Sequence, residues 1–130
     1  MRMLSVAVGL TIILLSFAAG AAKNCELIAS EAASVYAYCP PETTPQQMAA
    51  SAVSMGNKHF NQRQNQIHIY FFSNKKKTPK TGSGFAKMSD ADVDRYQTGI
   101  YDDNRNTNYL AFVCRKEHGK KLEKCESFLK

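Results

Sequence analysis

A dense run of β-forming residues at positions 66–73, with the sequence QIHIYFFS, stands out in the pattern of apolar and polar positions. Branched and aromatic side chains fill this run, which suits a pleated surface and crowds a helix. Because side chains alternate between the two faces of a strand, the run divides into two sets. The wholly apolar set is Ile67, Ile69 and Phe71, and the other set is His68, Tyr70 and Phe72. The pattern predicts a central strand with its apolar face in the core.

Two further stretches are typical of strands. Residues 35–39 alternate between small apolar side chains and tyrosines, and Pro40 and Pro41 end the run because neither nitrogen can donate to a ladder. Residues 109–114 are apolar on both faces, which favours a strand in the interior of a sheet. We therefore expect a sheet of three or more strands.

The segment between the first two strands predicts a helix from Pro45 to about Phe60. Thr44 stands at the N-cap position, and Gln47, three residues on, completes a capping box. An apolar stripe follows at Met48, Ala49, Ala52, Val53, Met55, Gly56 and Phe60. The small residues of this stripe would let the helix approach the sheet closely. A helix of this length between two strands joins them as parallel neighbours, so the predicted fold class is α+β with a β-α-β unit.

The other segments give weaker patterns. Residues 26–34 are rich in alanine and predict a short helix or turn, and the apolar spacing after Gly119 favours a terminal helix over the second arm of a hairpin. Between them we expect a mobile loop at 74–88, a short helix from Ser89 that ends by Gly99, and a loop at 102–108.

The amino-terminal residues are typical of a cleaved secretory signal. Arg2 is followed by an uncharged apolar run at 4–19 and by small residues up to Ala22. An uncleaved anchor is the alternative, but the run is shorter than the roughly 20 residues that span a bilayer. We expect residues 1–22 to be removed, and residues 23–130 to form a single α+β domain, periplasmic or secreted, without a membrane span.

Four cysteines lie outside the signal: Cys25, Cys39, Cys114 and Cys125. An even number of cysteines in a small exported chain favours two disulfides. Three pairings are possible, and we favour Cys25 with Cys39 and Cys114 with Cys125, because each closes a short loop. No pair has the short spacing of a zinc site, so we expect neither a metal nor a cofactor.

The chain carries a formal net charge of +6, unevenly distributed. A basic loop contains Lys75, Lys76, Lys77 and Lys80. Such runs are usually solvated surface, and an acidic partner is the alternative.

Three histidines could support acid–base chemistry, namely His59, His68 and His118. A basic exported domain with paired histidines could cleave a phosphodiester, with His68 as acid or base. No acidic residue lies beside His68 in the sequence, and no motif for a nucleophilic serine occurs. Asp102, Asn104 and Asn106 begin a calcium-loop spacing, which fails at Val113, where a bidentate glutamate would be needed.

The second face of the predicted strands provides the best candidate for a binding surface. It would carry Tyr36, Tyr38, His68, Tyr70 and Phe72. Exposed together, these side chains would mark a contact surface; the alternative is a second core layer, covered by the terminal helix or by the short helix after Ser89. The partner would be a protein or an envelope component, with an acidic one favoured by the basic loop, and nucleic acid is not expected outside the cell.

The sequence thus predicts an exported, non-catalytic binding module. An inhibitor, an immunity-type protein and an envelope accessory protein all fit this description. The alternative is a secreted phosphodiester hydrolase that uses His68.

Overall fold

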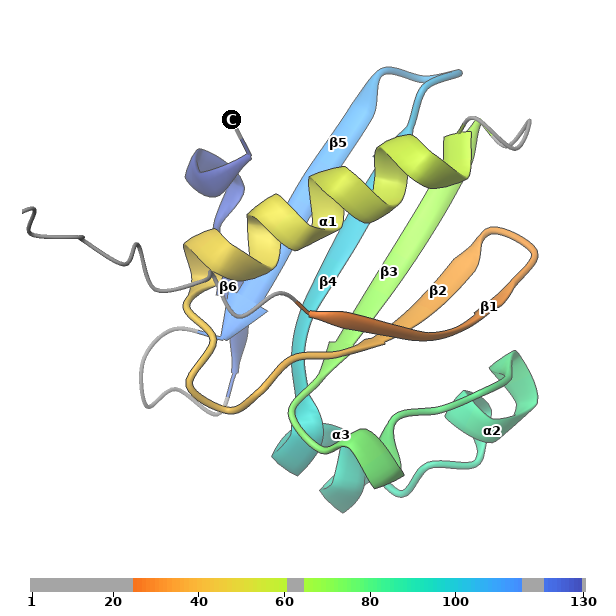
Figure 1. Cartoon of the computed structure of the whole chain (residues 1–130), viewed down its shortest axis with the longest axis vertical. Helices are drawn as coiled ribbons and strands as arrows, with labels where there is room; N and C mark the ends of the chain where they lie inside the picture. The colour runs from red at the N-terminus through yellow and green to blue at the C-terminus, as the bar shows by residue number, and fades with distance from the viewer. Residues whose placement is uncertain (1–24, 61–64, 116–120, 130) are drawn as a thin grey trace, which may run out of the picture.

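The computed structural model describes residues 25–60, 65–115 and 121–129 (Figure 1). They form one six-stranded sheet in sequential order, in which every pair of neighbours is antiparallel except the second and third strands. The strands are β1 (Glu26–Glu31), β2 (Ser34–Tyr38), β3 (Gln66–Phe72), β4 (Gln97–Asn104), β5 (Tyr109–Arg115) and β6 (Leu122–Lys124). The predicted α+β class and the parallel pair are confirmed. The predicted signal at 1–22 lies outside the described residues.

Helix α1 (Pro45–Phe60) connects the parallel strands β2 and β3, as predicted. Its start is fixed by a reciprocal capping box. The Gln47 N–H donates to Thr44 Oγ1 at 3.2 Å, and the Thr44 N–H donates to Gln47 Oε1 at 3.0 Å. Gly56 lets α1 approach the sheet, because a Cβ at this position would already touch the Tyr101 ring at 3.4 Å.

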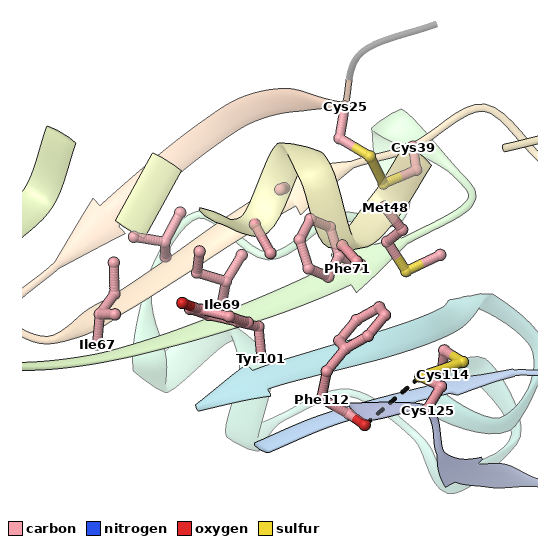
Figure 2. Packing of buried hydrophobic residues seen from close by; sticks show 14 of the residues in the cluster. Cys25, Cys39, Met48, Ile67, Ile69, Phe71, Tyr101, Phe112, Cys114 and Cys125 are labelled. Carbon is pink, nitrogen blue, oxygen red and sulfur yellow. Dashed lines mark hydrogen bonds between the residues drawn. A yellow bond between two sulfur atoms is a disulfide. The ribbon is translucent and has the colours of Figure 1, made fainter. Parts of the chain in front are cut away.

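The main core lies between α1 and one face of the sheet (Figures 1 and 2). The rings of Phe71 on β3 and Phe112 on β5 meet edge to face, with centroids 6.5 Å apart. Further buried residues of this layer are Val35, Ala37, Met48, Ala49, Ala52, Ile67, Ile69 and Tyr101. The apolar set predicted from the 66–73 run is therefore fully buried.

A smaller second layer covers part of the opposite face. It contains a 3-10 helix, η1 (Lys75–Lys77), and two short α-helices, α2 (Gly82–Ala86) and α3 (Asp90–Tyr96). The prediction of a mobile loop at 74–88 is wrong, because this segment is anchored. Thr81 Oγ1 accepts the Gly84 N–H at 2.9 Å, and Glu31 at the end of β1 accepts the Gly82 N–H at 2.5 Å. The short helix predicted after Ser89 corresponds to α3.

Three other predicted elements are wrong, because pairing with neighbouring strands overrides a weak local pattern. The segment 26–34 forms β1 and a turn into β2, where Ala32 adopts a φ of 50°. Residues 97–104 form β4 between β3 and β5, where we predicted the end of a helix and a loop. The terminal segment forms β6 and the 3-10 helix η2 (Glu126–Phe128), because residues 122–124 pair with β5.

Two disulfides join Cys25 with Cys39 and Cys114 with Cys125, which confirms the predicted pairing (Figure 2). None of the helices in the described part of the chain combines the length and hydropathy that a membrane span requires.

Candidate functional site

The face of the sheet opposite α1 is only partly covered. The second layer lies over the end of β3 near Phe72, and three rows of side chains cross the middle and far end of β3, β4 and β5. We call these rows the open face. They are Gln66, Asn104 and Tyr109; His68, Asp102 and Ala111; and Tyr70, Ile100 and Val113.

A fixed polar pair lies at the centre of the open face. His68 and Asp102 are directly opposite one another on β3 and β4, and His68 Nδ1 lies 2.5 Å from Asp102 Oδ1. Since the carboxylate accepts, Nδ1 carries the proton and donates. His68 Nε2 lies 2.7 Å from the side-chain nitrogen of Gln66, which donates to it. Both ring nitrogens are thus engaged, and the ring is held in one orientation.

Asp102 is the site residue that sequence reasoning missed. It lies 34 positions after His68, so no local spacing connects the two. The connection comes from the β3–β4 register, which pairs His68 with Asp102. Recognising 97–104 as a strand that pairs with β3 would have placed the acid beside the histidine.

Tyr70 forms the border between the open face and the second layer. Its ring stacks on Tyr36 at 5.7 Å and contacts Phe85 of α2 at 4.8 Å. Burial raises the pKa of the Tyr70 phenol, and the nearby charge of Asp102 raises it further. The phenol therefore remains a neutral hydrogen-bonding group well above neutral pH.

Two of the five aromatic-face residues predicted from the sequence are not exposed. Tyr36 is 2% exposed and Phe72 is completely buried, because the Phe85 ring packs on both at 5.9 Å and 5.8 Å. The prediction that they form part of an exposed face is wrong; they belong to a second core layer, which was the alternative interpretation. Helix α2 covers them, whereas we predicted that the terminal helix or the short helix after Ser89 would do so. Tyr38, His68 and Tyr70 remain partly exposed.

The basic loop is partly neutralised. Lys75 pairs with Glu26 at 2.8 Å and Lys77 pairs with Asp92 at 3.3 Å. Exposed pairs of this kind contribute little to stability, but they reduce the positive charge available to a partner. Lys76 and Lys80 are exposed and form no ion pair with any described residue.

Among the described residues, no second histidine lies beside His68. His59 lies on α1, which covers the other face of the sheet, and His118 lies outside the described residues. In the segment with the calcium-like spacing, the side chain of Asn104 stabilises its own turn. Its Oδ1 accepts the N–H groups of Asn106 at 3.1 Å and Thr107 at 3.3 Å. Within residues 25–60, 65–115 and 121–129, no three metal-binding side chains come together.

No protein-family model, curated protein or solved structure matches the chain. The open face offers hydrogen-bonding groups held in place by the sheet, with apolar side chains beside them.

Proposed function

We propose that the protein is an exported, non-catalytic binding module that docks a protein or other envelope component on its open face. One observation carries this proposal: the central strands of the sheet have a packed helix on one side, but on the other side the side chains of three rows, apart from the buried Ala111, stay at least partly exposed in the described chain. Tyr109 is 55% exposed there, and Ile100 and Val113 are partly exposed beside the His68–Asp102 pair. Aromatic and branched side chains around a fixed polar pair are typical of the centre of a protein interface.

Export is part of this proposal and is supported by the cysteines. Both disulfides close within the domain, and such bonds persist in oxidising compartments. The arrangement fits an inhibitor, an immunity-type protein or an envelope accessory protein, each of which works by holding a partner.

Tyr109 and Leu110 provide a matched pair of variants for the test. They are adjacent on β5, they are 55% and 45% exposed, and they lie on opposite faces of the sheet. We expect Tyr109→Lys to weaken capture of the partner from the native envelope by about tenfold or more, because it places a charge in the interface. Leu110→Lys should leave capture unchanged. Equal capture by both variants would contradict the proposal, provided that both unfold at the same urea concentration as the parent.

The His68–Asp102 pair also favours a second candidate, a secreted phosphodiester hydrolase. A carboxylate that orients a histidine is a recurring part of acid–base sites. Against it, Gln66 occupies the second ring nitrogen, and neither His68 nor Asp102 forms an ion pair with a lysine or arginine of the described chain that could hold a phosphate.

Incubation with RNA and DNA at several pH values tests the hydrolase. If it is correct, the parent cleaves one of them, and His68→Ala and Asp102→Asn both reduce the rate. Absence of cleavage by the parent, or equal rates in all three proteins, would eliminate this function.

A further inference from the structure

A cleft on the α1 side of the sheet is separate from the open face. Helix α1 packs on β3, β4 and β5, so the edge strand β1 extends beyond it (Figure 1). The space between β1 and α1 holds two adjoining hollows of about 370 Å³ and 240 Å³. Both are lined by Cys25, Ser54 and Met55, and the larger one also by Leu27, Ser30, Lys58 and His59.

Two polar side chains in the larger hollow have no side-chain partner among the described residues. His59 is only 8% exposed, yet it forms no hydrogen bond within the described chain. Its ring nitrogens are not among the buried polar atoms that lack a partner, so they are open to the cleft and can form a hydrogen bond with a ligand there. Lys58, the preceding residue, is exposed and forms no ion pair with a described residue. A donor beside a cation selects a carboxylate.

The rest of the cleft is suited to a polypeptide. Leu27 is 43% exposed and Met55 is partly buried, and the two form an apolar site in which the flexible methionine can adapt to different side chains. Strand β1 is at the edge of the sheet, and its outer side is paired with no described strand. Free edges of this kind bind extended segments through main-chain hydrogen bonds.

We propose that this cleft binds an extended, acidic segment of a partner polypeptide. An apolar side chain of the segment would lie between Leu27 and Met55, and a carboxylate would accept hydrogen bonds from His59 and Lys58. The site lies on the other side of the sheet from the open face, so the proposal does not depend on the function proposed above.

A fluorescein-labelled hexapeptide of alternating valine and glutamate tests the site by fluorescence anisotropy. We expect the peptide to bind the parent protein, and the same peptide with glutamine in place of glutamate to bind about fivefold more weakly. Lys58→Gln should weaken binding of the acidic peptide by a similar factor, and Leu27→Asp by about tenfold or more, since it places a like charge beside the ligand. Both positions are exposed, so both variants should fold.

Lys76→Gln on η1 is the control, because it removes an exposed lysine outside the cleft and should not change the affinity. The proposal is overturned if the acidic peptide does not bind, or if Lys58→Gln and Leu27→Asp bind it as well as the parent does. Glutarate is added as a competitor. If it displaces the peptide at a concentration near the peptide's own dissociation constant, the site binds small anions, and the polypeptide is excluded.

Discussion

At the scale of single residues, the open face depends on the pairing of His68 with Asp102. The histidine side chain is 30% exposed and the aspartate 28%, so water screens the pair only in part. Strand register positions the acid, and Gln66 holds the other ring nitrogen. The sequence revealed the histidine through its place in a strong strand, but the acid was hidden because residues that meet across strands have no characteristic spacing.

A double-mutant cycle measures this pairing. With His68→Ala, Asp102→Ala and the double variant, urea unfolding should give a coupling energy of about 1 kcal/mol, because a partly buried hydrogen bond is lost. The exposed pair Lys75 and Glu26, with side chains 58% and 52% exposed, is the control and should give a coupling close to zero. A His68–Asp102 coupling no larger than that of the control would mean that the ring is not held as the structure indicates.

The buried phenol of Tyr101 should make the free energy of unfolding depend on pH in the alkaline range. Its ring is 3% exposed, its hydroxyl donates to Asp103 Oδ2 at 3.1 Å, and burial raises the pKa of the phenol well above its ordinary value, with Asp103 adding to the effect. In the unfolded chain the phenol loses its proton near pH 10, but in the folded protein it does not. The free energy of unfolding should therefore fall as the pH rises above about 10.

The Tyr101→Phe variant isolates this effect. Phenylalanine has no hydroxyl group to titrate, so the variant should show a shallower fall in the free energy of unfolding between about pH 9 and pH 11. Urea unfolding at each pH gives the measurement. A slope as steep as that of the parent would show that Tyr101 is not the residue responsible.

At the scale of elements, the fold could be predicted where the local pattern and the tertiary structure agree. Helix α1 has a capping box and a continuous apolar stripe, and β3 has an unbroken run of β-formers. Strand β4 has the sequence QTGIYDDN, which is poor in β-formers, and it forms because β3 and β5 pair with it on both sides. The three-residue strand β6 likewise depends on β5, to which its segment is also joined by a disulfide.

The second layer depends on one aromatic side chain that the sequence did not single out. Phe85 stands among glycine, serine and alanine residues, so no periodicity marks it. Its ring nevertheless contacts Tyr36, Tyr70 and Phe72 and closes this layer of the core.

Phe85→Ala should lower the free energy of unfolding by about 2–3 kcal/mol, less than the full cost at a completely buried site because Phe85 is partly exposed. Lys80→Ala, two residues before α2 begins, changes an exposed side chain and should stay within about 0.5 kcal/mol of the parent. Equal stability of the two variants would show that Phe85 does not cover the sheet.

At the scale of the whole molecule, a disulfide lies near each edge of the sheet, and the open face occupies the middle of the sheet. Cys25 and Cys39 flank the β1–β2 hairpin, and Cys114 and Cys125 connect β5 with the segment after β6. Closing loops of this size contributes about 3 kcal/mol each in the chain-entropy model. The pairing could be predicted because short loops were favoured; the extent of the open face could not, because it depends on where α2 and α3 lie.

The most direct test of the central claim is carbene footprinting of side chains in the free protein and in the complex with its captured partner. In the free protein, Tyr109 and Leu110 should both be labelled, since both are exposed. In the complex, labelling of Tyr109 and Val113 should fall severalfold, and labelling of Leu110, on the other face, should not change. Protection of Leu110 with full labelling of Tyr109 and Val113 would contradict the claim that the partner docks on the open face.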